Sequence, residues 1–277
     1  MSFAINSTNN FASIGINNAQ NSQSDAMKKL SSMYRINSAK DDAAGAAIVQ
    51  LQTAQIRGTS QGIRNTNDGI SLAQTAQAGL GQVTDNLHRM RDLAVQAANG
   101  TNSASDRNAL QSEMNQLSQS NTDITGSSSF NGKLIFPSES ESISFQVGAD
   151  ASAADQISVS LNSLEGLNSV SGGEGTAIDV SQADSAQTAI DQIDADLAAV
   201  AEQSAGFGAV ENRFSAAIEN SQSYSINTQA SRSRIADTDV AKQVAELLKS
   251  QILEKSSMAV AGHANQSRQM VLSLLGS

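Results

Sequence analysis

The longest uninterrupted pattern of apolar positions runs from Ala43 to Ala98, a stretch without proline that is followed by Asn99-Gly100. In its second half, apolar residues follow one another in alternating steps of four and three, at Ala76, Leu80, Val83, Leu87, Met90, Ala94 and Ala97. This spacing places them on one helical stripe, as in the seam of a coiled coil. A helix over the whole stretch would be about 80 Å long at 1.5 Å per residue. The pattern therefore predicts an elongated helical rod.

The start of this helix carries a helix-capping signal. Ser38 and Asp41 form an S-x-x-D capping box, in which the serine side chain accepts the aspartate amide. A second box, Ser103 with Asp106, precedes a shorter apolar stripe at Leu110, Met114, Leu117 and Ile124 that ends near Gly126. We expect this second helix to fold back antiparallel on the first.

The apolar period then changes from helical to alternating. Leu134–Phe136, Ile143–Val147 and Ile157–Leu161 are short alternating segments between polar turns, which predicts a β-hairpin region over about residues 130–163. Residues 164–180 follow, and within them Leu164–Thr176 is rich in glycine and serine. This composition predicts a short surface loop that tolerates insertions.

Helical spacing returns after a third box, Ser181 with Asp184. The predicted stripe comprises Ile190, Ile193, Leu197, Val200, Ser204, Phe207, Glu211, Phe214 and Ile218. Its length makes it a partner for the long first helix. The central fold is thus predicted to be mainly α: an antiparallel helical bundle with a small β-hairpin region, covering residues 41–237.

Both ends of the chain are amphipathic. Near the N-terminus, apolar residues close to helical spacing are Phe11, Ile14, Ala19, Ala26, Leu30 and Met33. The last helix begins with Val240, Val244, Leu247, Leu248 and Ile252 and runs towards Leu274 and Leu275. Neither segment has a full core of its own, so each must bury its apolar face against the other or against another copy. Residues 1–40 and 238–277 are therefore predicted to form one discontinuous terminal-helix domain.

Composition and charge limit the classes of function and partner that the protein can have. Only 3% of residues are aromatic, which favours thin helix-on-helix layers over a thick core. A net charge of -10 without a dense basic run argues against nucleic acid as a partner. Residues 1–27 contain no Lys, Arg or apolar run, and no stretch is apolar enough for a membrane span. We expect a cytoplasmic protein or one exported without a cleavable signal, with no membrane insertion.

No enzymatic signature is present. The two histidines, His88 and His263, lie in different segments, and the chain has no cysteine, H-E-x-x-H, G-x-S-x-G or Gly-rich phosphate loop. Gly79 and Gly81 follow no strand and so do not form a dinucleotide-binding fingerprint. We expect no catalytic residue, metal ligand or cofactor.

A row of residues flanks the seam of the long helix. Arg89, Leu93 and Gln96 each precede a seam residue by one position, which rotates them by about 100°. Two interpretations stay open at this point. The row is either the flank of the bundle or a protein-binding ridge.

Several motifs in order along the chain resemble those of bacterial flagellin. On the N-terminal side they are Arg35–Gly45, Asp85–Asn99, Phe130–Leu134 and Phe145–Gly148, and on the C-terminal side Ala205–Phe214, Arg232–Asp239, Asn265-Gln266 and Val271–Leu275. Met33-Tyr34 and the final Leu275-Gly-Ser depart from the family pattern. Longer relatives insert outer domains where this chain has only Leu164–Thr176, so it resembles a minimal flagellin.

The resemblance implies an extracellular helical homopolymer for motility, whose terminal helices form the inner filament layer. The terminal polymerisation residues would be Phe11, Ile14, Leu30, Val244, Leu248, Ile252, Leu274 and Leu275. The core and assembly seam would be Leu80, Val83, Leu87, Met90, Ile193, Leu197, Val200, Phe207 and Phe214. The resemblance also implies export by the type III apparatus. The implied partners are an export chaperone at the C-terminal helix and the flagellar junction and cap proteins.

The same resemblance implies recognition of the monomer by Toll-like receptor 5 through Arg89, Leu93 and Gln96, with Glu113 on the next helix. Two other classes share parts of this pattern. A hook-filament junction protein usually carries a larger middle than this chain, and a metallopeptidase-bearing flagellin would need histidines, which residues 130–180 lack.

Overall fold

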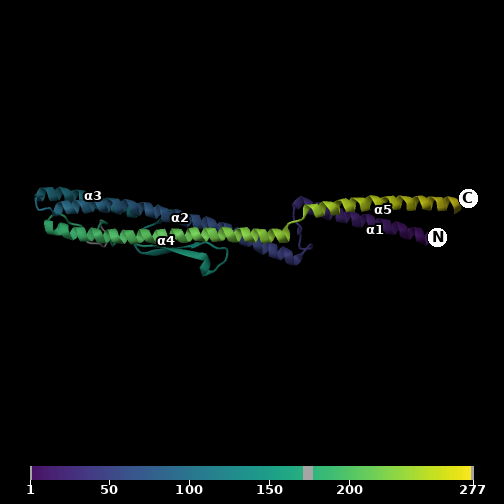
Figure 1. Ribbon diagram of the computed structural model, residues 1–277, viewed down its shortest axis with the longest axis horizontal. Helices are drawn as coiled ribbons and strands as arrows, with labels where there is room; N and C mark the ends of the chain where they lie inside the picture. The colour runs from purple at the N-terminus through teal and green to yellow at the C-terminus, as the bar shows by residue number, and fades with distance from the viewer. Residues whose placement is uncertain (1, 171–176, 276–277) are drawn as a thin grey trace. The chain divides into compact units, whose positions relative to one another are not determined.

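The computed structural model describes residues 2–170 and 177–275, with side chains for 10–170, 177–267 and 269–270 (Figure 1). Five helices account for most of the described chain: α1 Ser2–Ser32, α2 Ala43–Ala98, α3 Ala104–Ser127, α4 Ala183–Ala236 and α5 Val240–Leu275. The strands are β1 Ser129–Phe130, β2 Lys133–Leu134, β3 Glu141–Gln146 and β4 Gln156–Leu161, with a 3-10 turn at Ala153–Asp155. The prediction of a mainly α fold with a small β region is confirmed.

The chain forms two compact units. One contains Met1–Ala54 with Ile226–Ser277, and the other contains Gln55–Ser225. We call them the terminal unit and the central unit. Their boundaries fall inside α2 and α4, and not at the linkers where the sequence suggested a division at residues 40 and 238.

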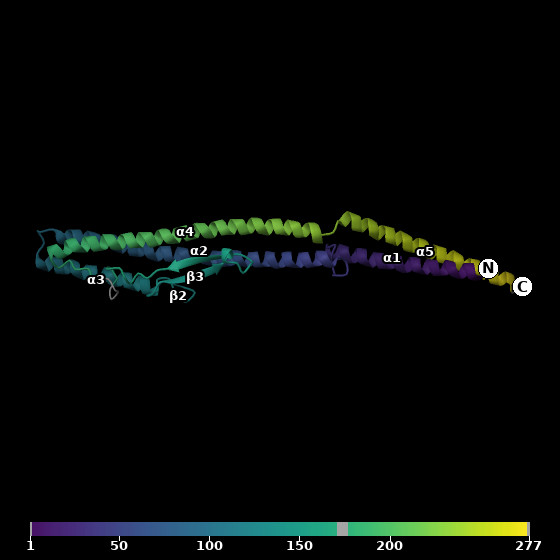
Figure 2. The same ribbon diagram turned by 90° about the horizontal axis from the view of Figure 1, so that it is seen from below.

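In the terminal unit, α1 and α5 lie side by side and antiparallel (Figures 1 and 2). The buried residues of α1 are Ala12, Ala19 and Ala26, one every seven positions, and their small side chains let the two helices approach closely. Phe11 is 73% exposed and Ile14 is exposed as well. Of the predicted stripe, Ala19 and Ala26 are therefore buried within the unit, whereas Phe11 and Ile14 lie outside its seam.

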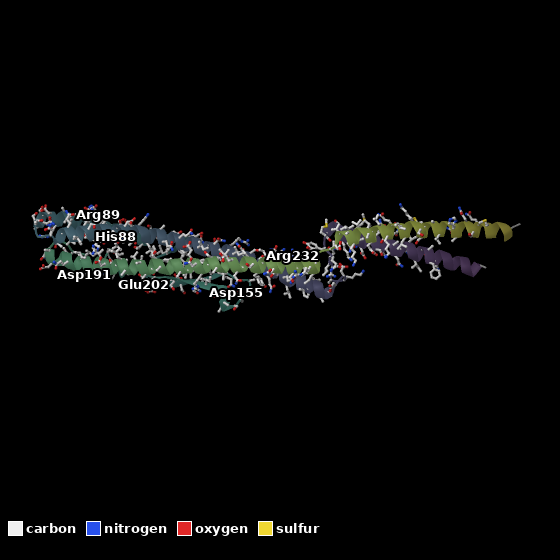
Figure 3. All side chains as sticks on the ribbon, in the orientation of Figure 1. His88, Arg89, Asp155, Asp191, Glu202 and Arg232 are labelled. Atoms are coloured by element: carbon white, nitrogen blue, oxygen red, sulfur yellow. The ribbon has the colours of Figure 1, made fainter. Side chains whose placement is uncertain are left out.

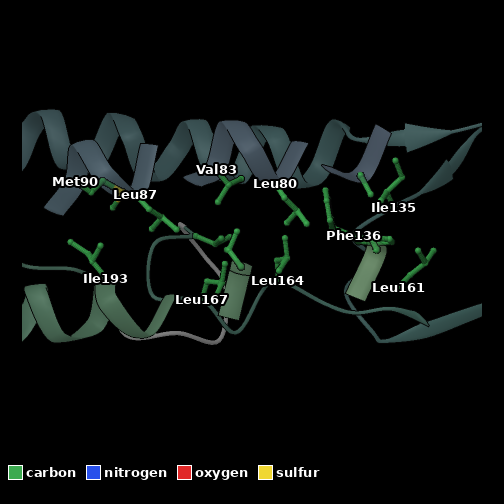
Figure 4. Packing of buried hydrophobic residues seen from close by; sticks show 14 of the residues in the cluster. Leu80, Val83, Leu87, Met90, Ile135, Phe136, Leu161, Leu164, Leu167 and Ile193 are labelled. Carbon is green, nitrogen blue, oxygen red and sulfur yellow. The ribbon is translucent and has the colours of Figure 1, made fainter. Parts of the chain in front are cut away.

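In the central unit, α2 runs antiparallel to both α3 and α4. Asn86 bonds to Asn121 of α3, and Arg91 and Gln74 bond to Asp194 and Glu211 of α4. All seven predicted seam residues of α2, from Ala76 to Ala97, are at most 1% exposed, which confirms the seam. Figure 4 shows Leu80, Val83, Leu87 and Met90 pointing into the core that they share with Ile193 of α4.

The stripe predicted on α4 is confirmed at four core positions, but the residues buried between these positions differ from the predicted ones. Ile193, Val200, Phe207 and Phe214 are buried as predicted. Between these positions the core buries Asp196 and Gln203, whereas Leu197 is only partly buried against it. Leu197 and Ser204, which the prediction placed on the stripe, are only partly buried, and the residue before each of them is buried instead.

The β region consists of two antiparallel hairpins. In the first, Asn131-Gly132 joins β1 to β2, and these two residues have φ of 51° and 79°. A tight two-residue hairpin turn needs such positive φ values, which asparagine and glycine adopt readily. In the second, β3 pairs with β4 from Glu141 opposite Leu161 to Gln146 opposite Gln156. The predicted strand Leu134–Phe136 is wrong beyond its first residue, because Ile135 and Phe136 leave the sheet and enter the core.

The segment predicted as a surface loop is largely buried where it is described. Leu164, Leu167 and Val170 belong to the core, and Ile178 and Val180 follow them there. Figure 4 shows Leu164 and Leu167 beside the α2 seam. Residues 171–176, the glycine-rich part of the prediction, lie outside the described residues. The surface-loop prediction is wrong for 164–170 because periodic apolar side chains there close the core.

One of the three predicted capping boxes is present. Ser103 and Asp106 cap α3 reciprocally, as expected. The box at Ser38 is wrong as the start of α2, because that helix begins at Ala43 and the Asp42 carboxylate accepts the Gly45 amide, 2.9 Å away. The box at Ser181 is also wrong: its amide donates to Asp179, and the first α4 bond runs from Ala186 to Gln182.

Candidate functional site

The predicted receptor-binding row contains an ion pair that joins two helices. Arg89 of α2 donates from Nε and from its terminal guanidinium nitrogen to the same Glu113 oxygen of α3, over 2.9 and 2.6 Å. The two side chains are 53% and 42% exposed. Figure 3 locates Arg89 and the exposed His88 on α2. The structure thus brings together two of the four predicted residues across a helix pair.

Leu93 does not lie on the surface. It is 1% exposed and belongs to the same core as Met90 and Ala94. One helical turn separates it from Arg89, so both residues face the side of α2 that α3 covers. At Leu93 the row is therefore the flank of the bundle and not an exposed ridge, because α3 gives the long helix a second buried flank.

Gln96 lies at the end of α2 with an exposed side chain. Its carbonyl accepts hydrogen bonds from the Asn102 side chain and the Asn99 amide. Arg107 of α3 donates to the carbonyls of Ala97 and Asn99, which places a cation at the negative end of α2. These bonds hold the α2–α3 connection beside the Arg89–Glu113 pair. The spacing of residues in the sequence did not predict this role of Arg107, which lies one residue after the α3 capping box.

A second interhelical ion pair lies two residues further along α2. Arg91 Nε donates to Asp194 of α4 over 2.7 Å. The hydrogen bond and the charge of Asp194 raise the pKa of Arg91, and the hydrogen bond from Arg91 lowers the pKa of Asp194. Arg89 and Arg91 therefore tie the long helix to α3 on one side and α4 on the other.

A buried carboxylate anchors the segment that follows β4. Asp196 is 2% exposed and accepts hydrogen bonds from the Ser169 amide at 2.7 Å and from the Asn168 amide and side chain at 3.1 and 3.0 Å. These donors offset the cost of removing the carboxylate from water. Sequence reasoning could not find this contact, since nothing in the spacing connects Asp196 with residues 168–169.

The terminal unit exposes an apolar face. Phe11 and Ile14 of α1 and Val244, Leu248 and Ile252 of α5 are all exposed, while Leu30 is partly buried. The side chains of Leu274 and Leu275 lie outside the described residues. The Ala-lined contact of α1 with α5 leaves these larger side chains without cover.

A half-open cleft of about 660 Å³ lies between β4, the segment after it and α4. Glu202 and Arg213 are the ionisable groups among its lining residues, beside Val159, Leu164 and Phe207. Within the described residues, no three His, Cys, Asp or Glu side chains gather as a metal-binding group. No described helix is long and apolar enough to cross a membrane.

Family models match both ends of the chain. A model of the bacterial flagellin N-terminal helical region matches residues 4–140, and a model of the bacterial flagellin C-terminal helical region matches residues 190–275. Together they cover α2, α3 and α5 and most of α1 and α4.

Individual relatives are similar over nearly the whole chain. A flagellin of Halalkalibacterium halodurans is 41% identical over 95% of this chain and 94% of its own length. Flagellin FlaB1 of Treponema pallidum is 36% identical, with 90% and 91% covered, and Flagellin B of Vibrio anguillarum is 33% identical, with 94% and 96% covered. The crystal structure of Bacillus cereus flagellin is 31% identical with a TM-score of 0.51, over 57% of this chain and 88% of that one.

Proposed function

Because this chain belongs to the bacterial flagellins and is a structural subunit that polymerises into the flagellar filament, we propose that the exposed apolar face of its terminal unit is the main polymerisation surface. Large side chains at Phe11, Ile14, Leu248 and Ile252 stay exposed although α1 and α5 are paired. Neighbouring subunits would bury them, with α1 and α5 forming the inner layer of the filament. Residues 1–40 and 238–277 would then order as one layer on assembly.

The test is truncation of either end. A chain lacking residues 1–36, or one lacking 240–277, is expected to remain a soluble helical monomer and to form no filaments when seeded, because half of the terminal surface is gone. Negative-stain microscopy measures the outcome. Filaments from either truncated chain at the parental rate would refute this assignment of the polymerisation surface.

The remaining partners of the subunit are those of an exported filament protein. We propose type III export, an extracellular location, flagellar junction and cap proteins as neighbours, and an export chaperone that covers the C-terminal helix. Cover of the apolar side chains Val244, Leu248 and Ile252 before export is the physical reason for a chaperone there. The relatives support a filament flagellin over a hook-filament junction protein, since they bear the name flagellin and align over nearly the whole chain.

A receptor surface on the free subunit is the second proposal. We propose that Toll-like receptor 5 contacts the Arg89–Glu113 pair and Gln96, and that buried Leu93 supports the helix beneath them. Arg89 has a planar guanidinium with several donors, and such a group often dominates an interface. In a filament, an adjoining subunit would cover the surface, so that recognition needs released monomer.

Arg89→Ala tests this proposal, with Arg91→Ala as the matched control. Arg89→Ala is expected to cost about 1 to 3 kcal/mol of receptor binding, whereas Arg91→Ala, which breaks a similar surface ion pair facing α4, should leave binding unchanged. Both variants should keep the parental circular dichroism spectrum. Receptor signalling by Arg89→Ala monomer at parental potency would reduce the patch to a structural contact.

A further inference from the structure

Two short linkers of the terminal unit are hydrogen-bonded to each other. Met33–Asp42 joins α1 to α2, and Asp237–Asp239 joins α4 to α5. Tyr34 and Asp237 face each other as an isolated antiparallel bridge. The Arg35 amide donates to the Ala236 carbonyl over 2.6 Å, and the Thr238 amide donates to the Met33 carbonyl over 3.1 Å. We call this contact between Met33–Arg35 and Ala236–Thr238 the linker clasp.

The Arg35 side chain caps the helix that ends at the clasp. Its Nε and a terminal guanidinium nitrogen donate to the Ile235 carbonyl over 3.2 and 2.7 Å. The last carbonyls of a helix have no partner within the helix, and the helix dipole makes that end negative. Arg35 supplies both donors and positive charge, although it lies 200 positions away from Ile235 in the chain.

The same guanidinium also lies near the start of α2. A terminal nitrogen of Arg35 is 3.7 Å from an Asp42 carboxylate oxygen. The other Asp42 oxygen accepts the Gly45 amide, and the Asp42 carbonyl accepts the Ala46 amide, so Asp42 is the N-cap of α2. One side chain therefore links the C-terminus of α4 with the N-cap of α2.

The clasp holds its own linker in an unfavourable conformation. Met33 follows the last residue of α1 and has a φ of 61°, in the left-handed region that disfavours residues with a side chain. The hydrogen bond from Thr238 to the Met33 carbonyl fixes this residue from the other linker. Without that bond, Met33 would be expected to relax to a negative φ.

We propose that Arg35 is a latch that makes the Met33–Asp42 linker and the last turn of α4 order and open as one cooperative unit. Arg35 belongs to the linker, and its guanidinium donates to the last turn of α4 while lying 3.7 Å from Asp42, so opening of either segment removes these contacts from the other. The linkers at which α1 leaves α2 and α5 leaves α4 are therefore coupled. This coupling lies within the chain and is independent of receptor binding.

Hydrogen exchange measured by mass spectrometry on filaments of the full chain tests the latch. Arg35→Ala removes charge-assisted hydrogen bonds and is therefore expected to speed amide exchange at least about tenfold. The factor should be the same in the peptides covering 34–42 and 230–238. Lys40→Ala removes a positive charge from an exposed position of the same linker and should change neither peptide. Peptides of the α2 seam, Leu80–Met90, should exchange as in the parent.

Two further variants keep the test decisive if Arg35→Ala does not assemble. Arg35→Lys retains charge but loses the planar fork, so both peptides should exchange faster by a smaller common factor. Met33→Gly accepts the positive φ without strain and should slow both. A change confined to 34–42 in any of these variants, or different factors for the two peptides, would overturn the latch and leave Arg35 as a local cap.

Discussion

Asp196 and Leu197 are neighbours on α4, and the core buries the charged residue more deeply than the apolar one. A carboxylate is tolerated there because three N–H groups of Asn168 and Ser169 point at it. Burial of a residue thus depends on which partners the fold brings to it, as well as on its hydrophobicity. Leu93 shows the same dependence for an apolar side chain. It lies beside the predicted seam and is buried because α3 helps to enclose it.

The same physics predicts the effect of a carboxylate without such donors. Leu87 is fully buried among apolar residues of the α2 seam, so Leu87→Asp should lower the free energy of unfolding by about 3 to 5 kcal/mol. Asp92→Ala, on the exposed side of the same helix, should be nearly silent. Thermal unfolding of the free subunit measures both, and equal midpoints for Leu87→Asp and the parent would contradict the assigned seam.

At the scale of elements, the residue at which a helix starts depends on which side-chain acceptor reaches the free backbone amides of its first turn. Ser103 and Asp106 satisfy each other's backbone groups at α3. At α2 the nearby Ser38–Asp41 pair has a different task, because Asp41 accepts the amides of Asn37 and Ser38 and so shapes the linker. The same S-x-x-D motif therefore forms a helix cap at Ser103 and a turn of the linker at Ser38.

This difference predicts unequal costs for the same substitution. Ser103→Ala should lower the free energy of unfolding by about 0.5 to 2 kcal/mol, the usual cost of losing an N-cap. Ser38→Ala should cost less, since the Ser38 hydroxyl donates to Asp41 and caps no helix amide. Chemical unfolding of the two variants in parallel measures the difference, and an equal or larger loss for Ser38→Ala would contradict it.

At the scale of the whole molecule, several carboxylates link stability to pH. The pKa of Asp194 is lowered by the hydrogen bond from Arg91, that of Asp106 by the Ser103 side chain and amide, and that of Asp41 by the Asn37 and Ser38 amides. A carboxylate whose folded pKa lies below its ordinary value of 3.8 contributes stability above that value. This contribution is lost as the pH falls through the folded pKa, where protonation breaks the contact.

The unfolding temperature of the free subunit should therefore change little between about pH 7 and 5 and fall below about pH 4. Asp194→Asn removes one titrating contact, so its loss of stability between pH 5 and 3 should be smaller than that of the parent. Differential scanning calorimetry at fixed ionic strength measures both. The same pH dependence in Asp194→Asn and the parent would exclude the Arg91–Asp194 pair as a contributor.

Local pattern was sufficient for the helical class of this protein, the α2 seam from Ala76 to Ala97, and the α3 cap, because each depends on residues three or four positions apart. Motif order also identified the family. The phase of α1, the burial of Leu93 and the core segment Leu164–Val170 depended on helix neighbours that are distant in sequence.

Tertiary structure alone decided which long-range partners meet. Arg89 meets Glu113, Asp196 meets residues 168–169, and Arg35 meets the end of α4 some 200 positions away. Periodicity tells which face of a helix is apolar, but it carries no information about which other segment supplies a donor or a charge to that face. Those contacts are set by how whole helices and the segments that connect them pack together, and not by spacing in the chain.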